Sequence, residues 1–139
     1  MDDQTIANSS LNQIHWWTPE YFKLIGFETR IPFDAHFGKA LIAPRGFVNT
    51  HALQDYWANP FGTHLTHVAA KKVYTWMGVD KNIAMHWRTG GHAQNPIDWT
   101  ALLDFSDQYF YNKKGSSRFD IEAYPTIKAP ISWEVPQEY

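Results

Sequence analysis

The feature that most constrains this fold is an alternation of two apolar patterns across residues 46–111. Two short runs typical of buried strands, Gly46–Thr50 and Ile83–Trp87, each precede a loop and then a longer segment with helical spacing. A strand–helix–strand–helix order favours parallel strands joined by a right-handed helical crossover. We therefore predict an α/β fold with a short parallel sheet, a βαβ crossover and flanking helices.

Both helices of this unit carry clear boundary signals. Asn59-Pro60 and Asn95-Pro96 each place a capping residue before a proline at the first helical position, and Gly78 ends the first helix. The apolar stripe predicted for the first helix comprises Leu65, Val68, Ala69, Val73, Trp76 and Met77. The apolar residues predicted for the second are Trp99, Leu102, Leu103, Phe105 and Phe110. By base rate, we expect Trp76 and Trp99 in the core.

The rest of the chain divides around this unit. Residues 1–14 are polar and are predicted to form a flexible lead. Residues 15–111 form one predicted domain, which begins with short helices after Thr18 and after Asp34. Residues 112–139 contain several prolines and serines without a sustained period, so we predict an extended tail.

Composition narrows the class of function. Hydrophobic residues make up 44% of the chain and charged residues 19%, as in globular proteins. The net charge of −2 provides no basic excess, so we expect no nucleic-acid partner. No apolar run reaches the roughly 20 residues of a membrane helix, so we expect no membrane association. The polar, acidic opening is unlike a signal peptide, which predicts a cytoplasmic location for the chain as encoded.

Metal and cofactor chemistry has little support in the sequence. Cysteine is absent, which excludes thiolate ligands and a cysteine nucleophile. His64 and His67 have an i, i+3 spacing that could ligate zinc, but they share a helix face with Lys71, opposite the apolar stripe. We predict that this pair lies on a solvated face, and that the protein holds no metal and no cofactor.

Two ionisable residues occupy the loops where an α/β sheet carries its functional groups, beyond the carboxyl ends of the strands. His92 follows the second strand within Gly90-Gly91-His92, and a histidine there can act as a general base near neutral pH. Asp55 follows the first strand and could orient that histidine. Hydrolases of this fold place the acid before the histidine in the chain. Taken alone, each residue is more often an ordinary loop side chain.

No serine fits a nucleophile elbow. The chain contains no G-x-S-x-G motif and no glycine-flanked serine after a strand. Its serines fall in the lead, within a predicted helix or in the tail: Ser9, Ser10, Ser106, Ser116, Ser117 and Ser132. The sequence therefore offers the acid and histidine of a triad without its serine.

Several motifs follow one another in a recognisable order: His15-Trp16-Trp17, Ile31-Pro32-Phe33-Asp34-Ala35-His36, Ala40 through Arg45, Asp55-Tyr56-Trp57-Ala58-Asn59-Pro60 with Gly62, His86, Gly91-His92, Asp98-Trp99 and Leu103-Asp104-Phe105. Together they resemble the bacterial glucuronoyl esterases of carbohydrate esterase family 15, over about residues 15–111. The tail has no counterpart in this resemblance. The resemblance implies the C-terminal part of an α/β hydrolase, a partial three-layer unit. It also implies that His92 is the catalytic histidine, Asp55 the acid and Trp57 a substrate-site residue.

This resemblance leads to two hypotheses about function. The first, which the sequence favours, is a non-catalytic, stand-alone esterase fragment that acts as a binding or structural domain, since the family's serine motif would lie upstream of Met1. The second is an esterase half that supplies the acid and histidine to a partner chain with the serine, the N-terminal esterase half. Under either, the ligand would be a uronate or xylan-type sugar. Relatives are usually exported. Because an incomplete sheet leaves an unpaired edge, we also expect a homo-oligomer.

Overall fold

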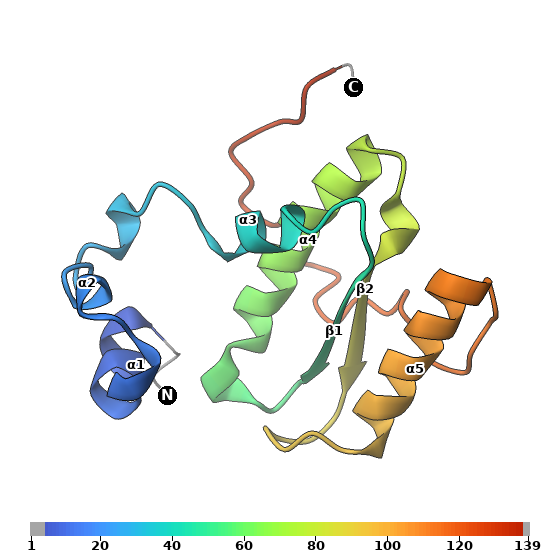
Figure 1. The fold of residues 1–139 in the computed structure, drawn as a ribbon, viewed down its shortest axis with the longest axis horizontal. Helices are drawn as coiled ribbons and strands as arrows, with labels where there is room; N and C mark the ends of the chain where they lie inside the picture. Colours follow the sequence, from blue (N-terminus) through green and yellow to red (C-terminus); the bar gives the residue numbers. More distant parts are fainter. Residues whose placement is uncertain (1–4, 138–139) are drawn as a thin grey trace.

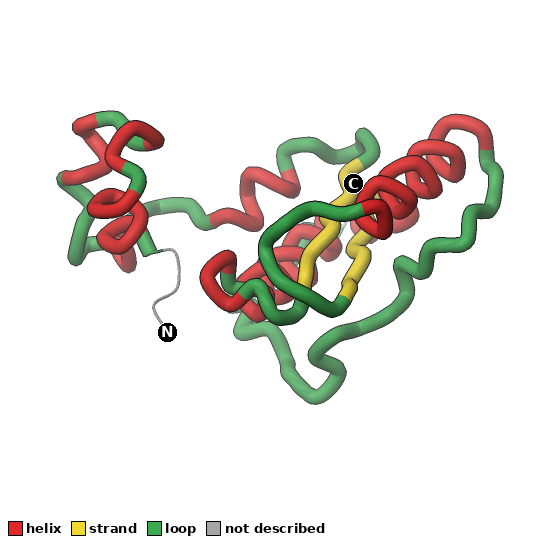
Figure 2. Tube along the Cα trace, turned by 90° about the horizontal axis from the view of Figure 1, so that it is seen from below, coloured by secondary structure: helices red, strands yellow, loops and turns green. Residues whose placement is uncertain are grey.

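A two-stranded parallel sheet forms the centre of the protein, whose computed structural model describes residues 5–137. Strand β1 (Phe47–Ala52) pairs in parallel with β2 (Ile83–Arg88), and helix α4 (Pro60–Trp76) connects them. Helix α5 (Pro96–Tyr111) follows β2. Figures 1 and 2 show α4 and α5 on opposite sides of the sheet. The predicted α/β class and the βαβ crossover are confirmed.

The two strands differ in how well they are covered. All six residues of β2 are buried, whereas five of the six in β1 are only half-buried. The core joins Ile83 of β2 to Ala70 and Tyr74 of α4, with Phe47 of β1 packed against this cluster. Within the described part of the chain β1 pairs with β2 alone, so its outer edge has no neighbouring strand.

The predicted helix starts have the expected local chemistry. The Asn59 side chain accepts a hydrogen bond from the Gly62 N–H at the start of α4, at 2.7 Å. Asn95 caps α5 in the same way. The Asp98 carboxylate accepts a hydrogen bond from the Asn95 N–H at 3.0 Å, which completes a capping box. These bonds satisfy backbone donors that a helix leaves unpaired in its first turn.

The region before the sheet is a series of short helices (Figure 1). The α-helices are α1 (Ile6–Asn12), α2 (Pro19–Phe22) and α3 (Ala35–Ala40). The 3-10 helices of this region are Ile14–Trp16 and Glu28–Arg30, whereas Tyr56–Ala58 and Asp80–Asn82 form further 3-10 helices between β1 and β2.

Helix α1 occupies residues 6–12 of the predicted lead. The Thr5 hydroxyl oxygen accepts from the Asn8 N–H at 3.1 Å, which caps α1, and Ser9 and Ser10 are buried. Residues 1–4 of that lead lie outside the described residues.

Two burial predictions for the long helices are wrong. His64 and His67 are 4% and 9% exposed. His64 packs on the Tyr124 ring of the tail, at 5.3 Å between centroids, and on Trp87 of β2. Trp99 is 55% exposed, because α5 turns Asp98, Ala101 and Phe105 toward the sheet instead. The stripe predicted for α4 is half-buried apart from Ala69, which is buried. The tail therefore gives α4 a second covered face.

The tail contains no helix or strand over residues 113–137 and packs back onto the βαβ unit. Lys72 of α4 donates to the Glu134 carboxylate at 2.9 Å and to the Trp133 carbonyl at 3.3 Å. On β2, His86 Nδ1 donates to the Arg118 carbonyl at 3.2 Å. Across the described residues, no helix combines the length and apolar character required to cross a membrane.

Candidate active site

The loops after β1 and β2 are joined by backbone hydrogen bonds. The Leu53 N–H donates to the Arg88 carbonyl at 2.8 Å, and the Gln54 N–H donates to the Gly90 carbonyl at 3.1 Å. The Gln54 side-chain oxygen in turn accepts from the Gly90 N–H at 2.6 Å. The parallel pairing thus continues beyond the strands and holds the two loops at a fixed spacing.

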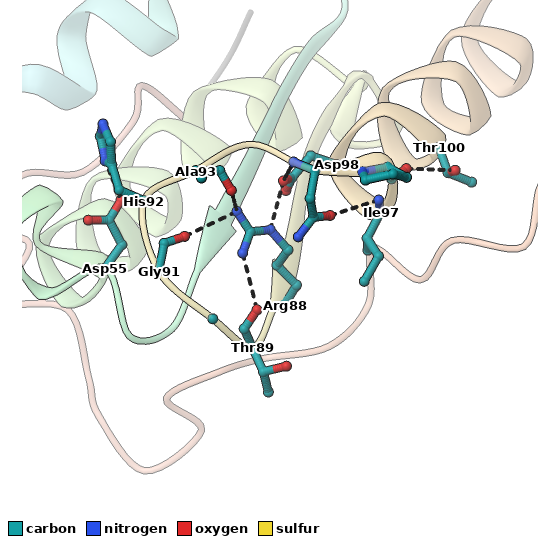
Figure 3. A network of polar contacts seen from close by, with 12 residues as sticks. Asp55, Arg88, Thr89, Gly91, His92, Ala93, Ile97, Asp98 and Thr100 are labelled. Atoms are coloured by element: carbon teal, nitrogen blue, oxygen red, sulfur yellow. Dashed lines mark hydrogen bonds and ion pairs between the residues drawn. The ribbon is translucent and has the colours of Figure 1, made fainter.

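Asp55 and His92 meet across these joined loops. His92 Nδ1 lies 2.9 Å from Asp55 Oδ2, and Figure 3 shows the two side chains next to each other. A carboxylate can only accept, so the imidazole nitrogen that faces it carries the hydrogen, and in a neutral ring Nε2 is then the acceptor. The Asp55 side chain is 12% exposed and that of His92 is 74% exposed. The acid is therefore sheltered and the imidazole is presented to solvent.

Trp57 lies beside this pair in the 3-10 helix Tyr56–Ala58. Its ring meets the His92 ring edge to face, with 6.1 Å between centroids and 76° between planes. A cavity of about 240 Å³ adjoins the pair, lined by Thr50, His51, Ala52, Asp55, Ala58, Arg88, His92, Gln94 and Asp98. The structure thus brings together all three residues that the sequence singled out.

The site also contains residues to which the sequence assigned no role in the site. Arg88, the last residue of β2, pairs with Asp98 of α5 at 2.7 Å between Nε and Oδ2, and their side chains are 6% and 2% exposed. His51 of β1 lines the cavity, and burial lowers its pKa, with the charge of nearby Asp55 opposing this shift. Two features of the sequence could have indicated the Arg88–Asp98 pair. Arg88 ends an apolar strand, and Asp98 is an acidic residue in the first turn of the helix that follows.

The two histidines that the sequence offered as metal ligands, His64 and His67, are both buried in α4. Burial lowers the pKa of His67 to about 3, and the positive charges of Lys39, Lys71 and His64 add to this effect. Over residues 5–137, no three histidine or carboxylate side chains gather in a way that could hold a metal ion.

The site thus combines a βαβ unit with an acid after the first strand and a histidine after the second, and the histidine bonds to the acid through Nδ1. This is the arrangement of an α/β hydrolase, in which the acid and the histidine lie beyond the carboxyl ends of parallel strands.

Comparison with known proteins narrows this class. A family model described as fungal glucuronyl esterase matches residues 2–78. Carbohydrate esterase MZ0003, from an unknown prokaryotic organism, is 27% identical over 121 residues, which are 76% of this chain and 28% of that protein. The 4-O-methyl-glucuronoyl methylesterase of Schizophyllum commune is 31% identical over 99 residues, 70% of this chain and 24% of that protein.

A solved structure agrees with these sequence relatives. A carbohydrate esterase family 15 glucuronoyl esterase from Caldicellulosiruptor kristjansonii superposes with a TM-score of 0.87 at 30% identity, covering 97% of this chain and 35% of that chain. The chain belongs to the glucuronyl esterase family, as the sequence motifs indicated. It spans about a quarter to a third of the length of these relatives. Because the superposition covers 97% of the chain, it extends into the tail, for which the sequence had suggested no counterpart.

Proposed function

We propose that this chain supplies the acid and histidine of a serine esterase site that hydrolyses carboxylic esters of glucuronate. The observation that carries this proposal is the 2.9 Å contact between His92 Nδ1 and Asp55 Oδ2 on an otherwise exposed imidazole. In a serine hydrolase the acid fixes the tautomer through Nδ1, and Nε2 takes the proton of the serine hydroxyl. His92 has its Nε2 available for this role.

The reaction assigns a distinct task to each residue. The serine oxygen attacks the ester carbonyl while His92 Nε2 accepts its proton, and the imidazolium then donates that proton to the leaving alcohol. A water molecule, deprotonated in the same way, releases the uronic acid and restores the serine. Asp55 stabilises the imidazolium formed in each half of the reaction. The serine and the oxyanion donors would come from sequence that the relatives have outside the matched region.

The substrate class follows from the relatives and from Trp57. One relative is named as a 4-O-methyl-glucuronoyl methylesterase and another as a glucuronoyl esterase, which supports a uronate ester. Trp57 places an aromatic ring beside His92, where it could pack against a sugar ring.

Complementation tests this proposal. The isolated chain should give no turnover of methyl glucuronate or nitrophenyl acetate above background, since it has no nucleophile elbow. When fused behind the serine-bearing part of the Caldicellulosiruptor enzyme, it should restore hydrolysis, and His92→Ala should lower kcat at least about a thousand-fold. His15→Ala, at an exposed histidine outside the site, should leave the rate unchanged. Restored hydrolysis that His92→Ala does not reduce would contradict the proposal.

A second candidate function is a non-catalytic binding domain, and the absence of a nucleophile elbow in this sequence favours it. In that case the chain would bind glucuronate through Trp57 without hydrolysing its esters. Binding lost in Trp57→Ala but kept in His92→Ala, together with no hydrolysis in the fused protein, would favour this second function. Saturable hydrolysis in the fused protein would exclude it.

A further inference from the structure

We infer that Arg88 is a positioning residue, which holds the loop of His92 in place and is itself held by Asp98. The inference rests on the proposed function only in taking His92 as the catalytic base. The guanidinium lies beneath the loop that connects β2 to α5, as Figure 3 shows, and its side chain is almost fully buried.

The guanidinium bonds to the loop backbone on both sides of His92. One nitrogen, Nη2, donates to the carbonyls of Gly91 and Ala93, the residues directly before and after His92, at 3.2 and 2.7 Å. The other terminal nitrogen, Nη1, donates to the Thr89 carbonyl at 3.1 Å. Three carbonyls within five residues thus converge on one side chain, so the path of the loop at His92 depends on the position of that side chain.

Asp98 fixes the direction of the guanidinium. Its Oδ2 accepts from Arg88 Nε at 2.7 Å and also from the Asn95 N–H at 3.0 Å, at the start of α5. One carboxylate oxygen therefore ties the end of β2 to the beginning of α5, the two ends of the loop that carries His92. The two opposite charges neutralise each other, and both are buried. Removal of either one would therefore leave an unpaired buried charge.

Gly90 supplies a second, independent observation. Its φ is +106°, a conformation that side chains rarely adopt, and an added Cβ would lie 3.1 Å from Arg88 Nη1. The loop therefore passes directly over the guanidinium at this point. Gln54 bonds to Gly90 from the other side, because its side-chain oxygen accepts from the Gly90 N–H and its own N–H donates to the Gly90 carbonyl. The loop is therefore fixed from two directions.

Only arginine has this arrangement of donors. Its planar group presents five N–H donors in fixed directions, whereas lysine has one rotating ammonium on a flexible stem. Arg88→Lys keeps the charge opposite Asp98 and cannot reach the carbonyls on both sides of His92 at once. We therefore expect the variant to fold and to lose the contact between His92 and Asp55.

The tautomer of His92 reports this contact without any enzyme assay. In the isolated chain, two-bond 1H–15N correlations at about pH 8, where an ordinary imidazole is neutral, distinguish hydrogen on Nδ1 from hydrogen on Nε2. The parent chain should show mainly the Nδ1–H form. In Arg88→Lys the Nδ1–H share should fall at least about two-fold while the amide spectrum of the sheet is retained.

Two further variants make this result interpretable. Arg118→Lys changes the same kind of pair, Arg118 with Asp120, on the exposed tail, and should leave the His92 tautomer unchanged. Arg88→Gln combined with Asp98→Asn removes both charges together, so no unpaired charge is buried if Arg88→Lys alone fails to fold. This double variant should also lose the Nδ1–H form.

Each outcome bears on a different claim. If the parent chain has mainly Nδ1–H and both Arg88 variants lose it, the positioning role is supported. If the folded variants keep the Nδ1–H form of the parent, the positioning role is wrong and the proposed function is unaffected. If the parent itself shows mainly Nε2–H, the contact between His92 and Asp55 does not hold in solution and the proposed function is contradicted.

Discussion

At the scale of the residue, the site combines a sheltered acid with an exposed base. The placement of Asp55 and His92 on neighbouring loops could be predicted because each follows a strand, and their roles were inferred from the resemblance to the glucuronoyl esterases. Arg88 could not be predicted, because an arginine at a strand end is also common on the surface. Its burial depends on Asp98, which folding brings to it from the next helix.

His67 predicts a pH dependence of stability. Its pKa is lowered to about 3 in the folded chain, whereas an unfolded histidine titrates near its ordinary value of about 6.5. As the pH falls below about 6.5 the unfolded state takes up a proton first, so stability is highest above that pH and is lost toward pH 3. We expect a loss of about 2–3 kcal/mol between pH 7 and pH 4 from this residue.

Urea unfolding over that pH range measures this loss. His67→Gln should flatten the dependence, whereas His15→Gln, at an exposed histidine, should not. A His67→Gln variant with the same pH dependence as the parent would show that His67 is not responsible.

At the scale of the element, features that depend on residues close together in the sequence could be predicted. Features that depend on residues far apart in the sequence could not. The caps Asn59 and Asn95 bond within three residues of themselves, so the starts of α4 and α5 could be predicted. The burial of His64 depends instead on Tyr124, which lies 60 residues further along the chain. Trp99 shows the same limit, since helical spacing alone did not indicate which sector of α5 would face the sheet.

The loop of His92 offers a matched pair of glycine substitutions. Gly90 has φ +106° and lies against Arg88, whereas Gly91 has no atom within 4 Å of an added Cβ. Gly90→Ala should lower the free energy of unfolding by about 1–3 kcal/mol, because it forces a strained conformation. Gly91→Ala should change it by less than about 0.5 kcal/mol. Equal effects in urea unfolding would show that the backbone of Gly90 is not constrained as described.

At the scale of the whole molecule, one edge of the sheet is left without a neighbouring strand, since β1 pairs only with β2 within the described residues. The tail packs against β2 through Arg118 and Tyr124, and within the described residues nothing pairs with the other side of β1. Large apolar side chains such as Trp16, Phe37 and Leu41 are exposed. Exposed strand edges and apolar surface favour association with another chain.

We therefore expect the isolated chain to self-associate. A dimer or larger oligomer should bury at least about 1,000 Å² in total, the usual minimum for a specific interface. Light scattering across a dilution series at micromolar concentration measures this. The fused protein, in which the serine-bearing part would cover the edge of β1, should be monomeric under the same conditions. A stable monomer of the isolated chain at every concentration would refute this expectation.

A double-mutant cycle in the fused protein tests whether Asp55 and His92 act as one catalytic unit. Residues that act as a unit show strongly non-additive losses. The measurement compares kcat for methyl glucuronate hydrolysis in His92→Ala, in Asp55→Asn and in the double variant. We expect the double variant to lose no more activity than His92→Ala alone. Losses that multiply in the double variant would show that the two residues act independently, and would contradict this expectation.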